Sequence, residues 1–294
     1  MTTASPTTFE QRIPAVASSD LLGGIRPYYQ DAHCKIYNGD SRELLPEIHK
    51  ADLVIADPPY TFGLSSTQQK ASKGGGWADL MNNALFYALI LREVKRITKP
   101  TNGAAWFFNS WRSMPVLQRA SWESDWPIES MLVWDKGPEV GMGGCRGLRA
   151  QYELVALLVQ DGYQIANRST KDILNVPWGG SAPRSNHPAE KPVALMVKLI
   201  ECATKTNAVI LDPFCGSGTS LIAAKQTGRT AIGIEMEECH CETAAKRLTA
   251  EMSLMPPNVL AHTREGAAVN LNEGLTLAPG AAGASSAETK EVAP

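Results

Sequence analysis

The stretch AVILDPFCGSGTSLIAA, residues 208–224, decides the fold of this chain. It opens with a short apolar run that predicts a buried strand, and this strand ends in Asp212. Gly216 and Gly218 then permit a tight turn, and Thr219 can cap the helix that follows. A glycine turn of this kind lets the backbone approach a ligand closely and aims a helix N-terminus at it. The stretch therefore predicts a strand–loop–helix unit that binds a ligand.

The next predicted strand, Thr230–Ile234, ends in an acid, Glu235, 23 positions after Asp212. A carboxylate at that place accepts hydrogen bonds from the hydroxyls of a ribose. The alternative is an ordinary acid at the start of a helix, where the helix dipole favours it. We expect the ribose role, because the glycine turn and the acid occur together.

Strands and helices alternate along the middle of the chain. The predicted strands are Lys35–Asn38, Leu53–Ala56, Gly103–Phe108, Ile128–Trp134, Tyr152–Val159, Ala208–Leu211 and Thr230–Ile234. The predicted helices are Ser41–His49, Met81–Thr98, Trp111–Trp122, Lys191–Thr204 with Pro192 in its first turn, Thr219–Thr227 and Glu237–Thr249. This alternation predicts a doubly wound α/β fold, in which helices cover both faces of a mostly parallel sheet.

The chain divides into a central domain and two flanking segments. We expect residues 1–30 to be a flexible leader. Residues 256–294 are rich in Ala, Gly, Ser, Glu and Pro, which predicts a disordered tail. Between them, residues 31–255 are predicted to form one domain that carries an insert at about 136–185.

The composition argues against several classes of protein. No apolar stretch approaches the roughly 20 residues that a membrane span needs, and the N-terminus lacks the basic and apolar regions of a signal peptide. The six cysteines form no C-x-x-C pair, so we expect free thiols in a reducing cytoplasm and no metal site. The net charge is −2, and the predicted tail carries all of it. Any contact with nucleic acid must therefore come from a local basic patch.

A second strand end, in ADLVIADPPYTFG at residues 51–63, also carries polar groups. Its apolar run is followed by Asp57, Pro58, Pro59 and Tyr60. The two prolines remove two backbone donors and fix two φ angles, so this segment is stiff. One interpretation is a turn that caps the strand. The other is a rigid platform that holds Asp57 and Tyr60 in place for chemistry.

Together, these segments resemble the amino-methyltransferases of DNA. Asp57–Tyr60 is similar to their catalytic motif, Asp212–Thr219 to their loop for S-adenosylmethionine (SAM), and His187–Pro192 to the segment before that loop. The order of catalytic motif, variable region and SAM loop resembles the β class, which is circularly permuted relative to other SAM enzymes. The resemblance covers about residues 33–250 and implies a Rossmann-like methyltransferase fold.

The resemblance implies a site for SAM around the glycine loop. The residues that would line it are Asp212, Phe214, Cys215, Gly216, Gly218 and Thr219. Glu235 would hold the ribose, and Lys191 would face the methionyl carboxylate, which a cation and a helix N-terminus both favour. Asp40 would reach the adenine of SAM, although its sequence position is equally that of an N-cap for the helix from Ser41.

The resemblance also implies a catalytic role for Asp57, Pro58, Pro59 and Tyr60. An exocyclic amine is a poor nucleophile, because its lone pair is delocalised into the ring. Asp57 would accept one N–H of the amine and the Pro58 carbonyl the other, in an arrangement that the prolines keep rigid. The target base lies inside a duplex and must be flipped out, and Tyr60 would then stack on it. This chemistry needs no metal.

The segment from Lys136 to Ser185 is the expected reader of double-stranded DNA. Its basic residues are the expected contacts: Arg146 and Arg149 for guanine or phosphate, and Arg168, Lys171 and Arg184 for the backbone. The alternative is a plain solvent loop with scattered charges. The insert is short for this family, so the target is short or the reader needs a partner subunit. The sequence leaves a homodimer and a separate cognate nuclease open.

Three alternatives to an adenine N6 methyltransferase stay open. The nearest keeps the fold and changes the base to cytosine N4. The second methylates RNA or a protein glutamine, although such enzymes usually carry Asn at the position of Asp57 and place the SAM loop first. The third is an inactive DNA-binding module, which the intact Asp57 and Tyr60 argue against. We expect adenine, because enzymes that resemble this chain more often carry Asp here for adenine and Ser for cytosine.

Overall fold

The computed structural model describes residues 21–58, 84–138, 148–178 and 190–254. Four of the predicted site residues, Pro59, Tyr60, Arg146 and Arg184, lie outside the described residues. The same holds for residues 1–20 of the leader and for the whole predicted tail.

A nine-stranded sheet forms the centre of the described domain, in the order β1-β2-β9-β8-β3-β4-β6-β5-β7. The strands are β1 Tyr29–Gln30, β2 Cys34–Asn38, β3 Leu53–Ala56, β4 Ala104–Asn109, β5 Ile128–Asp135, β6 Tyr152–Val159, β7 Ile173–Asn175, β8 Val209–Asp212 and β9 Thr230–Glu235. The five strands from β2 to β4 in this order are parallel. Strand β6 runs antiparallel to both β4 and β5, and β1 runs antiparallel to β2.

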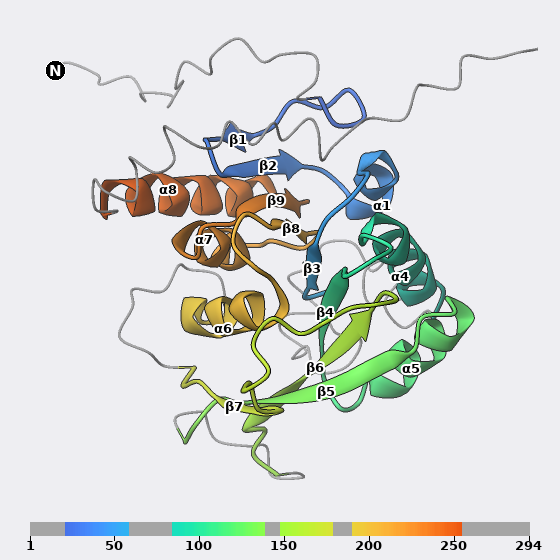
Figure 1. The fold of residues 1–294 in the computed structure, drawn as a ribbon. Helices are drawn as coiled ribbons and strands as arrows, with labels where there is room; N and C mark the ends of the chain where they lie inside the picture. The colour runs from blue at the N-terminus through green and yellow to red at the C-terminus, as the bar shows by residue number, and fades with distance from the viewer. Residues whose placement is uncertain (1–20, 59–83, 139–147, 179–189, 255–294) are drawn as a thin grey trace, which may run out of the picture.

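Helices cover both faces of the sheet, as Figure 1 shows. They are α1 Ser41–Leu44, the 3₁₀ helix η2 Leu45–Glu47, α4 Ala84–Ile97, α5 Met114–Glu123, α6 Val193–Ala203, α7 Thr219–Gln226 and α8 Glu238–Leu254. Helices α6, α7 and α8 lie on one face, and α1, α4 and α5 lie on the other. Two apolar clusters fill the two layers, one against each group of helices. The predicted doubly wound, mostly parallel α/β fold is confirmed.

Several predicted boundaries were wrong. The helix predicted for Ser41–His49 divides into α1 and η2, because Pro46 has no N–H to donate to the preceding turn. Pro192 is the N-cap residue of α6, so it lies just before the first turn. The helix predicted from Trp111 begins only at Met114, after a turn.

The folded domain also starts before residue 31, where its start was predicted. Leu22 is buried in the core, and β1 pairs with β2 through Tyr29–Gln30. A two-residue strand shows no periodicity in sequence, and the same is true of the three-residue strand β7, which was not predicted either.

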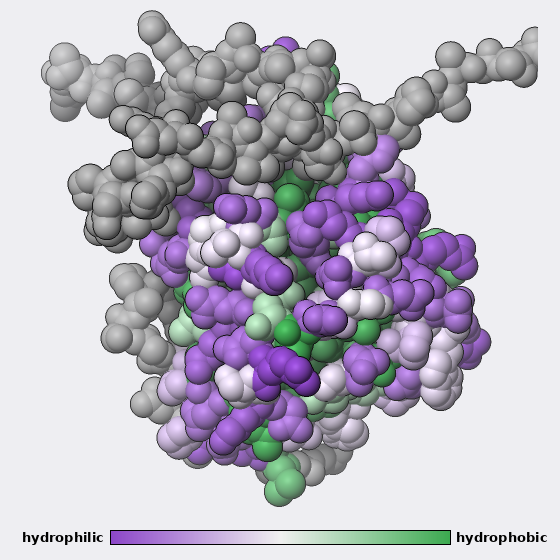
Figure 2. Space-filling view, in the orientation of Figure 1, coloured by the Kyte–Doolittle hydropathy of each residue, from purple (hydrophilic) through white to green (hydrophobic). Residues whose placement is uncertain are grey.

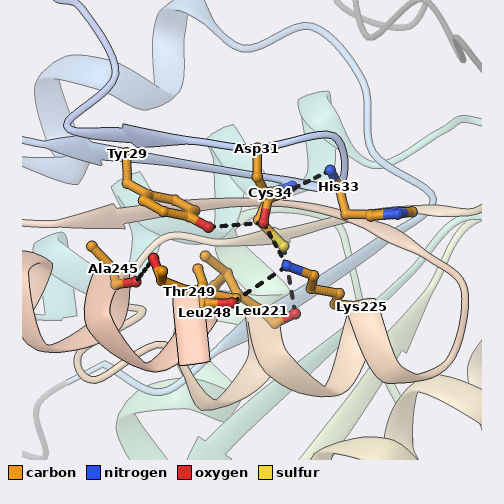
Figure 3. A network of polar contacts seen from close by, with 9 residues as sticks. All are labelled: Tyr29, Asp31, His33, Cys34, Leu221, Lys225, Ala245, Leu248 and Thr249. Carbon is orange, nitrogen blue, oxygen red and sulfur yellow. Dashed lines mark hydrogen bonds and ion pairs between the residues drawn. The ribbon is translucent and has the colours of Figure 1, made fainter. Parts of the chain in front are cut away.

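A buried ion pair attaches the β1–β2 turn to the helical layer (Figure 3). The Lys225 ammonium, on α7, lies 2.5 Å from Asp31 Oδ2, and the two side chains are only 2% and 8% exposed. Asp31 also accepts the hydroxyl of Tyr29 at 2.9 Å and the backbone N–H groups of His33 and Cys34 at 2.7 Å. Burial raises the pKa of Asp31, but Lys225 and the two N–H groups outweigh it, so the pKa lies below its usual value.

Replacing Asp31→Asn should lower the free energy of unfolding at pH 7 by about 3–5 kcal/mol, because it leaves the Lys225 charge buried without its partner. The folded-state pKa of Asp31 is depressed, so its contribution is present above the unfolded pKa and is lost as the pH falls through the folded pKa. The difference between the two proteins in urea denaturation should therefore shrink below about pH 4. Equal stabilities at pH 7 would contradict this account of the ion pair.

Candidate active site

The two sequence motifs meet where β3 and β8 lie side by side. These strands are parallel neighbours, with Leu53 opposite Ile210 and Val54 opposite Leu211. Asp57 follows β3 and Asp212 ends β8, so both carboxylates lie at the carboxyl edge of the sheet. The helices that follow, α4 after β3 and α7 after β8, cover opposite faces. Such a point, where the winding of the sheet changes direction, is where open α/β sheets bind their ligands.

Hydrogen bonds fix the loop between β8 and α7, both within the loop and to the neighbouring strand β9. Asp212 Oδ1 accepts the Phe214 N–H at 2.9 Å, and its Oδ2 accepts the Ser220 hydroxyl. The N–H of Cys215 donates to the carbonyl of Ile234 on β9 at 3.0 Å. The loop is therefore rigid, and it is attached to the strand that carries Glu235.

Glycine is required at two positions of this loop, since Gly216 and Gly218 have left-handed φ angles of +50° and +79°. A Cβ on Gly218 would lie 2.8 Å from the Cβ of Ala244, so α7 and α8 can approach each other only with glycine there. Gly218 is the N-cap residue of α7, and the predicted cap, Thr219, is instead the buried first residue of the helix.

Glu235, at the end of β9, links the glycine loop to α8. Its Oε2 accepts the Gly216 N–H at 2.9 Å, and its Oε1 accepts the Glu237 N–H at 2.9 Å. Asp40 lies on the same edge, because Gly39 donates to the Glu235 carbonyl at 3.0 Å. The carboxylate of Asp40 caps α1 through the Arg42 N–H at 2.8 Å and forms an ion pair with the Arg42 guanidinium. Its N-cap role is thus present in the structure.

The other two side chains of the predicted SAM loop have different surroundings. The ring of Phe214 lies 6.3 Å from that of Phe86 on α4 and is tilted against it. The thiol of Cys215 is buried beneath Gly233, and burial raises its pKa well above the usual value. Cys215 can therefore contribute its backbone to a ligand site, and its thiol belongs to the core.

Burial also changes the titration of Asp212. It raises the pKa of this carboxyl to about 7, although the Ser220 hydroxyl and the Phe214 N–H favour the ionised form. The negative charges of Asp57 and Glu235 raise the pKa further. A cation bound at this edge would favour the ionised form of Asp212.

Lys191, just before α6, pairs with Asp57. Its ammonium lies 2.5 Å from Asp57 Oδ2 and 3.5 Å from Glu153 Oε2, and its side chain is 7% exposed. Burial lowers the pKa of Lys191, but the charges of Asp57 and Glu153 outweigh this effect and raise it. Lys136 lies 2.5 Å from the other oxygen of Glu153. Lys191 was predicted to face the methionyl carboxylate of SAM. In this structure it forms an ion pair with Asp57, the predicted catalytic acid.

Sequence reasoning missed Glu153, which joins two lysines at this edge. Along β6, Glu153, Val155 and Leu157 point to the same face, and the latter two are buried in the core. An acid on the buried face of a predicted strand was the available signal, because such a charge needs a partner.

The structure brings only some of the predicted DNA contacts near this edge. Arg149 precedes β6, whose third residue, Leu154, pairs with Asn109 at the end of β4, and it donates to the Pro138 carbonyl. The segment of Arg168 lies elsewhere, since Asn167 donates to the Cys202 carbonyl at the far end of α6. Arg149, Arg168 and Lys171 are all exposed. On the face shown in Figure 2 the described surface is mostly hydrophilic, and hydrophobic residues are visible mainly in a band between the two helical layers.

No metal site is visible among the described residues, where His, Cys, Asp and Glu form no cluster of three or more with suitable placement. Within the same ranges, no helix is long and apolar enough to cross a membrane.

The fold and this edge define a doubly wound α/β protein with a glycine loop at the carboxyl edge of its sheet, and comparisons with known proteins specify its family. The model of the N6/N4 family described as "DNA methylase" matches residues 51–246. The type II methyltransferase M2.LlaDCHI of Lactococcus lactis subsp. cremoris is 28% identical over 77% of this chain and 94% of its own length. The crystal structure of the M1.HpyAVI–SAM complex is 25% identical, with a TM-score of 0.58 over 73% of this chain and 98% of that one. The cytosine-N4-specific PvuII methyltransferase, at 18% identity, shares the fold with a TM-score of 0.65 over 83% of this chain and 97% of that one.

This chain belongs to the N6/N4 DNA methylase family, the SAM-dependent amino-methyltransferases of DNA that act on adenine N6 or cytosine N4. The resemblance inferred from the motifs is therefore confirmed at the level of the family, and so is its fold.

Replacing Gly218→Ala should destabilise the protein and weaken SAM binding at least about tenfold, because the new methyl group pushes α7 away from α8 and deforms the loop. Gly228→Ala is the matched control, since Gly228 has a φ of +71° and open space around its Cβ position. The control should show only the backbone strain, about 1 kcal/mol, and bind SAM normally. Thermal unfolding and calorimetry would measure both effects, and equal behaviour of the two variants would show that the contact with Ala244 is unimportant.

Proposed function

We propose that this protein transfers a methyl group from SAM to the exocyclic N6 of a flipped-out adenine in double-stranded DNA. The observation that carries the proposal is the carboxylate of Asp57, anchored by Lys191 at the point where the catalytic-type motif and the glycine loop adjoin. The same geometry would serve cytosine N4, which is the alternative.

The residues at the carboxyl edge fit a nucleoside-containing cation such as SAM. The glycine loop presents backbone without side chains, and Asp212 and Glu235 place two acids beside it. We assign SAM binding to Asp212, Phe214, Cys215, Gly216, Gly218 and Thr219, with Glu235 on the ribose and Asp40 on the adenine. When bound, SAM supplies a methyl group activated by a positively charged sulfur.

Asp57 can supply the acceptor that the amine chemistry requires. Its Oδ2 is held by Lys191, and a carboxylate has lone pairs on both oxygens, so it can accept one N–H of the target amine as well. The carbonyl of Pro58 would accept the other N–H, and Pro59 and Tyr60 complete the proposed motif. With both N–H groups held, the nitrogen lone pair would be left free to take the methyl group that bound SAM would supply. The electrons of the broken C–S bond would stay with sulfur, and the methylated amine would release one proton to water.

Lys191 therefore has a different proposed role from the one its sequence context suggested. As the partner of Asp57 it fixes the rotation of this carboxylate, which is preorganisation of an acceptor. The ammonium has three donors, so a contact with the methionyl carboxylate of SAM is compatible with this role.

DNA binding is assigned to the insert at 136–185, through Arg146, Arg149, Arg168, Lys171 and Arg184. Among the described residues, Arg149 has the most support for this assignment, because its exposed segment leads into β6 near the carboxyl edge of the sheet. Arg168 has less support, since its segment is bound to the far end of α6.

Replacing Asp57→Ala should lower kcat by about a hundredfold or more and leave the affinity for SAM largely intact, because the lost acceptor acts mainly in the transition state. Transfer of the labelled methyl group from SAM into duplex DNA gives kcat, and calorimetry gives the affinity. If kcat survives while SAM binding collapses, Asp57 belongs to the cofactor site.

The methylated base should be N6-methyladenine, because Asp rather than Ser occupies position 57. DNA treated with the purified protein and SAM would be digested to nucleosides and analysed by mass spectrometry. N4-methylcytosine as the main product would overturn the choice of base and leave the proposed roles of Asp57 and Lys191 standing.

A further inference from the structure

Four side chains of alternating charge form a row along the carboxyl edge of the sheet. Asp57 after β3, Lys191 before α6, Glu153 on β6 and Lys136 after β5 follow one another in it. The N···O distances are 2.5, 3.5 and 2.5 Å in that order, and the four side chains are between 7% and 22% exposed. Their formal charges cancel, so the row as a whole is neutral.

Glu153 has a position in this row that packing alone does not explain. It lies on the face of β6 whose next residues, Val155 and Leu157, are core residues. Withdrawing a carboxylate from water is costly, and well-packed apolar residues in place of a buried ion pair are often neutral or stabilising. A charge at this place therefore suggests a use in the site.

We propose that Glu153 is a positioning residue for methyl transfer, which acts on Asp57 through Lys191. This inference rests on the proposed role of Asp57. With two carboxylates beside it, the Lys191 ammonium is held between them, above the ring of Phe108 at 5.2 Å. Without the charge of Glu153, Lys191 would lose the second carboxylate that fixes its position, and Asp57 would lose the fixed partner that orients it toward the target amine.

Glu153 also connects Asp57, at the carboxyl edge of the sheet, to the segment proposed to bind DNA. Its other oxygen binds Lys136, the first residue of that insert, whose ammonium lies 5.3 Å above the ring of Trp134. A displacement of Lys136 would move Glu153 and thereby change the position of Lys191. The row is thus a physical link between the proposed reader and the proposed catalytic carboxylate.

The test compares Glu153→Gln with Glu153→Asp in steady-state methyl transfer to duplex DNA. Gln keeps the size and removes the charge, whereas Asp keeps the charge and loses one methylene group. We expect Glu153→Gln to lower kcat about tenfold with less than about a twofold change in KM for SAM and DNA, and Glu153→Asp to retain most of the activity. A purely structural role predicts the opposite order, because Gln fits the site better than Asp does.

A double-mutant cycle tests whether Glu153 acts through Lys191. In a Lys191→Met background, Glu153→Gln should cause no further loss of single-turnover rate, since the intermediary is gone. Equal fold-losses in both backgrounds would overturn the proposal, and so would an unchanged kcat in Glu153→Gln alone.

Asp31→Asn provides the matched control for loss of a buried acid. Asp31 also pairs with a buried lysine at 2.5 Å, but it lies before β2, at the opposite edge of the sheet from Asp57. Its loss should lower stability and leave kcat per folded molecule unchanged. All rates are taken relative to the wild type, and the transferred label is counted whether it is in adenine or in cytosine. A wild type that methylates cytosine, or that methylates nothing, is therefore recognised as a failure of the proposed function and not of the role of Glu153.

Discussion

The pairing of β3 with β8 is the constraint on which the rest of the site depends. Only two residue pairs define its register, supported by hydrogen bonds of 2.9 Å between Asp52 and Val209 in both directions. Because the strands are parallel, this pairing brings the segment after Ala56 and the glycine loop after Asp212 to one edge. The segments are far apart in the sequence, and neither forms a site without the other.

Crowding of like charges is the consequence of this arrangement. Asp57, Asp212 and Glu235 end neighbouring strands, and each acid is stabilised in a different way. Glu235 accepts two backbone N–H groups, and Asp57 has a lysine. Asp212 has only neutral donors within a buried place, which is why its pKa reaches about 7. The edge is therefore suited to a cationic ligand, in agreement with the methyl donor of this family.

The antiparallel part of the sheet sets where the segment proposed to read DNA lies. Reversal of β6 relative to β4 places the start of β6 and the end of β5 beside the active edge. Lys136 and Glu153 come from these ends, so the segment between β5 and β6 begins and finishes next to Asp57. The proposed DNA reader inserted there would contact its target within reach of Asp57, which a parallel connection across the sheet would not provide.

The sequence by itself determined the class of fold and the identity of the two motifs. Strands β3 and β6 were predicted with the bounds that the structure has, because apolar runs bounded by turn residues are a local signal. The need for glycine at position 218 was also a local signal, although the capping residue was wrongly taken to be Thr219. The family followed from the order of the motifs along the chain.

Only the tertiary structure decided which charges meet. Lys191 was expected to face a ligand, but its ammonium lies on Asp57, and Glu153 was not considered at all. Strands β1 and β7 were missed as well, since two or three residues carry no period and pair only when a neighbouring edge is already present. Ion pairs between distant segments depend on strand order and register. Both are set by the packing of the whole sheet, so the local pattern of residues does not predict them.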